Sequence, residues 1–168
     1  MSWTNECTES NEFKVRQPQE VREVLELMGF NVYESTNGLS FVTSGEGTFF
    51  NEDTEIVLSL KPISIEGEEK NLIGITSDYS NDSIDLDTIE DEYGVKKGEY
   101  MVTPLVEYLQ DQLLDKEYIT VTCAGFESRC SGSFSPFGDV TIITKNNTEF
   151  FNLSQAVDEF LKKNNLAE

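Results

Sequence analysis

The sequence predicts an α+β fold in which about three helices pack on a mainly antiparallel sheet. Hydrophobic residues make up 38% and aromatic residues 11% of the 168 residues, which is enough to build a hydrophobic core. Apolar residues recur at helical spacing in three segments, and this pattern predicts the helices. Turn residues separate several runs of strand-forming residues, and hairpin turns favour antiparallel pairing.

Each predicted helix has a starting signal and an apolar stripe that should face the core. Pro18 and Pro104 suit the first helical position, where a missing N–H costs nothing, and Thr103 would cap the second helix. Asn152 with Gln155 three residues later resembles a capping box. The stripes are Val21, Val24, Leu25 and Met28, then Leu105, Val106, Leu109 and Leu113, and finally Ala156, Val157, Phe160 and Leu161.

Strands are predicted over residues 30–35, 39–43, 55–60, 72–76, 118–124 and 140–144. Asn37-Gly38 is a strong hairpin signal because both residues tolerate positive φ, and Gly67 marks a second turn. Residues 125–138 are rich in Gly and Ser and indicate a loop or hairpin region. We expect one domain over residues 13–168, a flexible arm over residues 1–12, and an acidic insertion at about 78–98 that forms a long loop.

Several features of the sequence predict a cytoplasmic protein without a membrane partner. No apolar run approaches the ~18–20 residues that a membrane span needs. The first thirteen residues have neither the basic nor the apolar region of a signal peptide. Cys7, Cys123 and Cys130 are odd in number and form no CxxC pair, which favours reduced thiols.

The charge of the chain is large and unevenly distributed. The 32 acidic and 12 basic residues give a formal net charge of −20, of which −15 falls within residues 31–120. Residues 78–92 contain seven carboxylates and no Lys or Arg. These carboxylates are Asp78, Asp82, Asp85, Asp87, Glu90, Asp91 and Glu92. Because such charge opposes compaction by self-repulsion, we predict that this segment is a surface that binds a partner.

The pattern of residues 84–89 predicts a short extended piece within the acidic segment. Ile84 and Leu86 alternate with Asp85 and Asp87, so a strand would place both acids on one side, about 6.6 Å apart. That separation is close to the spacing of phosphates along a nucleic-acid strand. A solvated, disordered loop is the alternative interpretation of the same residues.

These observations favour a non-enzymatic protein that binds a basic partner. One specific form of the hypothesis is inhibition of a nucleic-acid-binding protein by nucleic-acid mimicry; direct binding of nucleic acid is not expected, because phosphates would repel this chain. The alternative is a structural or assembly subunit of a viral particle or multi-protein complex. In that case Phe134 and Phe137 are the candidate interface residues, because aromatic residues beside glycines and serines can anchor contacts.

Enzymatic readings are weakly supported. The chain has no His, which removes histidine triads, histidine zinc sites and the commonest general base. No glycine-rich phosphate-binding motif occurs, and the acidic segment fits no register of an EF-hand calcium loop. The remaining candidate is a metal-dependent nuclease with Asp53 and the Glu68-x-Lys70 tripeptide. We therefore assign no catalytic residue, no cofactor and no metal.

Overall fold

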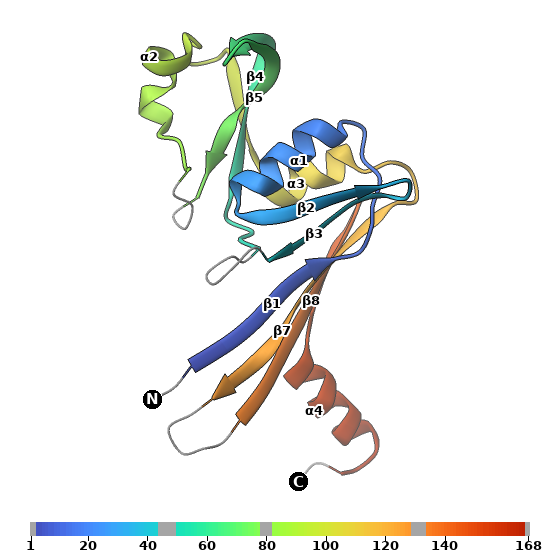
Figure 1. The fold of residues 1–168 in the computed structure, drawn as a ribbon. Helices are drawn as coiled ribbons and strands as arrows, with labels where there is room; N and C mark the ends of the chain where they lie inside the picture. The colour runs from blue at the N-terminus through green and yellow to red at the C-terminus, as the bar shows by residue number, and fades with distance from the viewer. Residues whose placement is uncertain (1–2, 44–49, 78–81, 129–133, 167–168) are drawn as a thin grey trace.

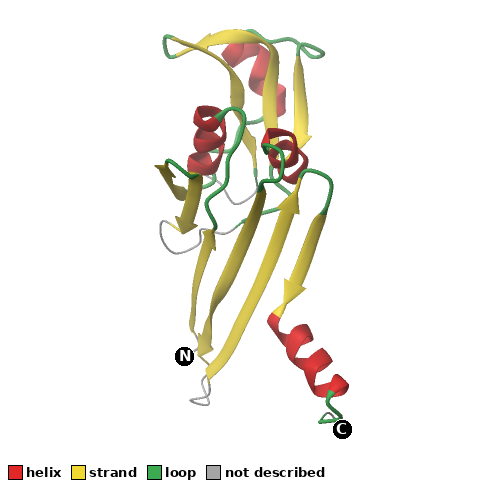
Figure 2. Ribbon diagram, turned by 90° about the vertical axis from the view of Figure 1, so that its right-hand side faces the viewer, coloured by secondary structure: helices red, strands yellow, loops and turns green. Residues whose placement is uncertain are grey.

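The computed structural model describes residues 3–43, 50–77, 82–128 and 134–166, with the backbone alone described at 3–6, 126–128 and 134–137. Within these residues, nine strands form two antiparallel sheets that are accompanied by four α-helices. The predicted α+β class is therefore confirmed. Figure 1 and Figure 2 show the two sheets on either side of helices α1 (Pro18–Leu27) and α3 (Leu105–Gln112).

The larger sheet has six strands in the order β2-β3-β1-β7-β8-β9. Their bounds are β1 Trp3–Ser10, β2 Phe30–Ser35, β3 Gly38–Thr43, β7 Tyr118–Ser128, β8 Phe134–Thr144 and β9 Thr148–Asn152. The β2–β3 hairpin forms as predicted, but it turns at Thr36-Asn37, one residue before the expected Asn37-Gly38, and Gly38 begins β3 opposite Ser35. Strands β7 and β8 extend into the region expected to be a Gly/Ser-rich loop or hairpin.

The N-terminal segment differs from the flexible arm that its sequence suggested. Residues Trp3–Ser10 form β1, which pairs with β7 over eight residues, from Trp3 opposite Ser128 to Ser10 opposite Val121. This segment is polar and carries little strand propensity of its own. Pairing with β7, a partner more than a hundred residues away in sequence, supplies the strand conformation.

The smaller sheet has three strands in the order β5-β4-β6. Their bounds are β4 Glu55–Ile65, β5 Glu68–Thr76 and β6 Tyr100–Pro104. The sequence did not predict β6, and Thr103 lies in this strand opposite Ile56 and does not cap a helix. Helix α3 begins one residue later than expected, at Leu105, because Pro104 ends the strand and occupies the N-cap position.

Helices α1 and α3 lie between the two sheets and share one hydrophobic core with both of them. The core includes Phe41 and Ile119 from the larger sheet, Ile56 and Ile75 from the smaller sheet, and Leu109 from α3. Each of these side chains is at most 1% exposed. The stripes predicted for the first two helices contribute as expected, with Val21, Val24, Leu25, Leu105, Leu109 and Leu113 buried.

Helix α4 (Leu153–Lys163) begins where the sequence predicts, but its apolar stripe is not buried. The Asn152 side chain accepts hydrogen bonds from the backbone N–H groups of Ser154 and Gln155 at 3.0 and 3.4 Å. Ala156, Val157 and Phe160 are exposed, and Leu161 is only partly buried. The prediction of a buried stripe was wrong because α4 follows the edge strand β9 and lies beside the sheet, with no described layer over it (Figure 1). Within the described chain, no helix combines the length and apolar character required to cross a bilayer.

Candidate functional site at the acidic crossover

The acidic segment connects two parallel strands. Strands β5 and β6 each pair antiparallel with β4, so they run parallel to each other on its two sides. A chain that links parallel strands must cross the sheet. Residues 77–99 make this connection, and we call them the acidic crossover. In Figure 1 the crossover stands on the side of the small sheet that faces away from α1 and α3.

The crossover covers a hydrophobic face of the small sheet. Successive residues of a strand point to opposite faces, so Ile56 contributes to the main core while Val57 points to the other side. There Val57 and Ile73 form a second buried cluster with Ile89 and Val95 of the crossover. Ile89 and Val95 are 1% and 3% exposed. The described part of the crossover is therefore an ordered layer of the fold and not a solvated loop.

The start of the crossover is held against the end of β5. The Ile84 N–H donates to the Ile75 carbonyl at 2.9 Å, and the Ser77 N–H donates to the Ser83 hydroxyl at 2.9 Å. Ile84 packs directly over Gly74, where an added Cβ would lie 2.9 Å from the Ile84 Cγ2 atom. The absence of a side chain at position 74 thus lets the crossover approach the sheet closely.

The predicted extended piece is helical instead. A 3-10 turn spans Leu86–Thr88 and α2 spans Ile89–Tyr93. The Asp85 carboxylate accepts a hydrogen bond from the Asp87 N–H at 2.9 Å, which caps the turn. This local bond competes with the extended conformation that the alternating pattern suggested, and it is a common role of Asp at the start of a helix.

The acids of the crossover point to solvent, while Ile89 and Val95 point to the sheet and Leu86 is exposed. Asp82, Asp85, Asp87, Glu90, Asp91 and Glu92 are all exposed. Asp78 lies outside the described residues. Asp85, Asp87 and the three acids of α2 form no ion pair with any residue that the structure describes.

Part of the crossover lines an acidic groove of about 670 Å³. The carboxylates that line it are Asp53, Glu55, Asp85 and Asp87, and no Lys or Arg is among the described lining residues. Glu55 begins β4 and Asp53 lies in the turn two residues before it, and this end of β4 lies beside the end of β5 because Glu55 pairs with Thr76. We use the name acidic groove for this hollow. It contains two residues predicted to bind a partner, Asp85 and Asp87. Asp53 was considered only for the nuclease alternative, and Glu55 was not singled out by the sequence.

The carboxylates of the acidic groove are distributed around it. Among the residues described, no three carboxylate or thiol side chains are placed to hold a metal. The other groove residues include the polar side chains of Asn51, Thr76, Ser77 and Ser83. Distributed carboxylates can accept hydrogen bonds from several guanidinium or ammonium groups, and these charge-assisted bonds are stronger than neutral ones.

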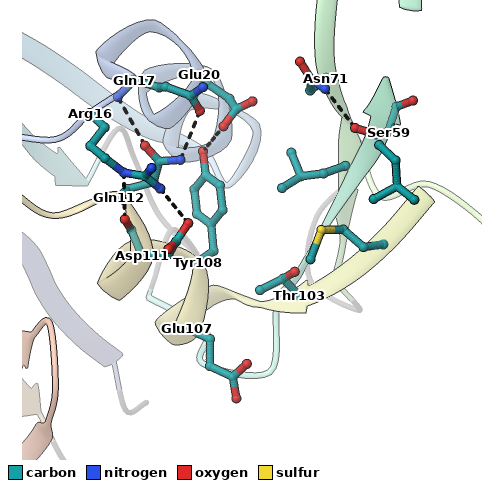
Figure 3. A pocket seen from close by; sticks show the side chains of 13 residues that line it. Arg16, Gln17, Glu20, Ser59, Asn71, Thr103, Glu107, Tyr108, Asp111 and Gln112 are labelled. Carbon is teal, nitrogen blue, oxygen red and sulfur yellow. Dashed lines mark hydrogen bonds and ion pairs between the residues drawn. The ribbon is translucent and has the colours of Figure 1, made fainter. Parts of the chain in front are cut away.

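A second hollow, of about 580 Å³, lies between the helices and strands β4 and β6 (Figure 3). On the helical side its polar groups bind one another. The Tyr108 hydroxyl donates to the Glu20 carboxylate at 2.8 Å, the Gln112 amide donates to Gln17 at 3.1 Å, and Arg16 pairs with Asp111 at 2.7 Å. These three contacts connect the start of α1 and the two residues that precede it to α3. We assign this network a structural role because its partners already satisfy one another.

Tyr108 makes the stability of the helix pair dependent on alkaline pH. Burial, together with the nearby Glu20 carboxylate, raises the pKa of the Tyr108 hydroxyl far above its ordinary value. The fold therefore favours the protonated phenol, whereas an unfolded chain loses this proton near pH ~10. The stability that Tyr108 contributes is complete below pH ~10 and declines as the pH rises above that value.

We expect Tyr108→Phe to lower the free energy of unfolding by about 1–2 kcal/mol at pH 7, since Glu20 loses its donor. Above pH ~10 the difference between the wild type and the variant should shrink, because only the wild type exposes an ionisable phenol at this position on unfolding. Urea denaturation of both proteins from pH 7 to pH 11 measures the effect. A difference that grows with pH would contradict the assigned role.

The residues of the nuclease alternative do not converge. Glu68 begins β5, whereas Asp53 lies near the other end of that strand, beside Thr76. Eight residues of extended chain separate these ends, roughly 26 Å. The Lys70 ammonium pairs instead with the Glu23 carboxylate of α1 at 3.3 Å.

The predicted aromatic interface residues lie in a strand. The backbone of Phe134 pairs with Ser128, and that of Phe137 pairs with Gly125, within the β7–β8 hairpin. Their side chains lie outside what the structure describes.

Comparison with models of protein families, with curated proteins and with solved structures found no match for this chain.

Proposed function

We propose that this protein is a non-enzymatic interaction protein that binds a basic polypeptide surface through the acidic groove. The observation that carries the proposal is the meeting of four carboxylates, from two separate chain segments, around one hollow that no described Lys or Arg lines. Like charges held together on a folded scaffold repel one another. A partner that brings Lys or Arg side chains into the groove removes this repulsion and forms charge-assisted hydrogen bonds.

The structure changes which basic partner is favoured. The spacing argument for nucleic-acid mimicry required Asp85 and Asp87 to lie in an extended strand, and Asp85 instead caps the turn that contains Asp87. The carboxylates of the acidic groove come from two chain segments, whereas nucleic-acid mimicry would need a linear row of charges. The proposal therefore names a basic segment of polypeptide as the partner.

A labelled octa-arginine peptide is a direct probe of this proposal. The test variant combines Asp53→Asn with Asp87→Asn, since both side chains are exposed groove residues. The matched control combines Glu66→Gln with Glu69→Gln, which removes the same charge at the opposite, turn end of β4 and β5. Fluorescence anisotropy at 50 and 300 mM NaCl gives the dissociation constants of all three proteins.

At low salt we expect the groove variant to bind roughly tenfold more weakly than the wild type, since two contacts of about 0.7 kcal/mol each are lost. The control variant should bind nearly as well as the wild type. Wild-type affinity should fall steeply with salt, because screening weakens exposed charge pairs. Equal weakening in both variants would show that net charge, and not the groove, binds the peptide, and the proposal would then fail.

A further inference from the structure

A second surface of the molecule is apolar. Half of the twelve large hydrophobic side chains that are exposed in the described residues fall between positions 150 and 166. We call these six residues the α4 patch: Phe150, Phe151, Leu153, Val157, Phe160 and Leu166, each 45–65% exposed. An amphipathic helix whose apolar side faces water is typical of an interaction surface.

The α4 patch lies far from the acidic groove. Helix α4 is at one end of the molecule and the acidic crossover is at the other, in both views (Figure 1, Figure 2). The two surfaces also differ in charge. Helix α4 contains two acids, Asp158 and Glu159, and two bases, Lys162 and Lys163, so it is neutral within a chain of net charge −20. Electrostatic attraction therefore does not direct a basic partner to α4.

The order of charges on α4 fits a second copy of the same helix. Glu159 and Lys163 are four residues apart, so they lie on the same flank of the helix. If two α4 helices pack antiparallel about a two-fold axis at Leu161, Glu159 of each copy faces Lys163 of the other. Phe160 then lies next to the axis. The contact is self-complementary, as a two-fold interface requires.

The geometry points to a homodimer in which two copies pair antiparallel through α4, with the apolar side of α4 buried between them. Two chains of net charge −20 repel, so they can approach most easily at a locally neutral surface. Aromatic side chains present roughly 150–250 Å² each, so two half-exposed phenylalanines, Phe160 and one of the β9 pair, offer on the order of 200 Å² per copy. With the three aliphatic members, the contact stays below the ~800 Å² per partner of an ordinary specific interface, so we expect a weak dimer.

Sedimentation velocity between 5 and 500 μM protein, at 150 and 500 mM NaCl, tests the dimer. We expect a concentration-dependent shift from monomer to dimer that strengthens with salt, because salt screens the mutual repulsion but leaves the apolar contact intact. This salt response is opposite to that of the peptide bound in the acidic groove. A monomer at every concentration and at both salt levels would overturn the inference.

Phe160→Ser should weaken the dimer on the order of a hundredfold, since each copy loses a large apolar side chain from the contact. The matched control is Tyr33→Ser, because Tyr33 of β2 and Phe160 are 59% and 61% exposed. The control should dimerise like the wild type. An equal loss in both variants, or a dimer unaffected by Phe160→Ser, would show that α4 is not the contact.

A charge exchange tests the antiparallel arrangement without removing apolar surface. Glu159→Lys alone and Lys163→Glu alone should each weaken the dimer on the order of tenfold, because each change creates two like-charge contacts related by the two-fold axis. The double variant should recover wild-type association, since it exchanges the two partners of the same pair. If the double variant stays as weak as the single ones, the antiparallel pairing is wrong.

Discussion

Replacing Gly38 with alanine is expected to destabilise the protein by more than about 3 kcal/mol, because two separate costs add at this position. The first is backbone strain, since Gly38 has φ of +127°, which L side chains rarely adopt. The second is a direct clash: a Cβ at this position would lie 2.2 Å from the carbonyl oxygen of Phe13 and 2.6 Å from its carbonyl carbon. These are backbone atoms, so no change of rotamer relieves the contact.

The clash should reach the core. Phe13 and Leu39 exchange two backbone hydrogen bonds of 2.8 Å, and their side chains are 0% and 2% exposed. Moving the Phe13 backbone therefore breaks both bonds and withdraws a core ring. Urea denaturation measures the loss. Gly67→Ala is the matched control, because Gly67 has φ of +83° but nothing within 4 Å of the added Cβ. We expect about 1 kcal/mol there, and equal losses at the two sites would contradict this explanation.

Ile89→Ala is expected to detach the acidic crossover while the rest of the fold persists. Ile89 is buried in the second cluster, and truncation of such a side chain typically costs about 2–4 kcal/mol. No member of the second cluster belongs to the main core, so the loss should be local. Hydrogen exchange should show lost protection in residues 84–95 and unchanged protection in α1, α3 and β7.

Leu109→Ala provides the comparison, because Leu109 is equally buried but belongs to the main core. It should lower protection throughout the described chain. Ile89→Ala should also reduce octa-arginine binding, although every carboxylate is retained, since the wall that carries Asp85 and Asp87 is released. Unchanged peptide affinity in this variant would show that the peptide does not depend on the folded groove.

The sequence predicted those elements whose signals are local. The Asn37-Gly38 dipeptide predicted the β2–β3 hairpin to within one residue of its turn, and Pro18 predicted the start of α1. Strands β1 and β6 were missed because their pairing partners are distant in sequence, whereas β9 was missed although it pairs with the adjacent β8. Helix α4 shows a related limit of local signals. The spacing of its apolar residues predicted the helix correctly, but whether another layer covers those residues depends on the whole fold.

The acidic groove could be predicted only in part for the same reason. Density of charge drew attention to Asp85 and Asp87, and both line the groove. Asp53 and Glu55 lie about thirty residues earlier in the chain and reach the groove through the pairing of Glu55 with Thr76. The start of β4 and the end of β5, which meet at this edge, were both predicted near their observed positions. The missing information was the register in which these two strands pair.

The parallel arrangement of β5 and β6 has a consequence for how the chain folds. The β4–β5 hairpin forms from neighbouring segments, but β6 can join β4 only after residues 77–99 close a long loop across the sheet. That loop gathers mutually repelling carboxylates as it closes, so its own charge opposes the step. Because counterions relieve this opposition, we expect closure of the crossover to become faster as ionic strength rises. The segment that makes the surface acidic is thus also expected to slow completion of the small sheet.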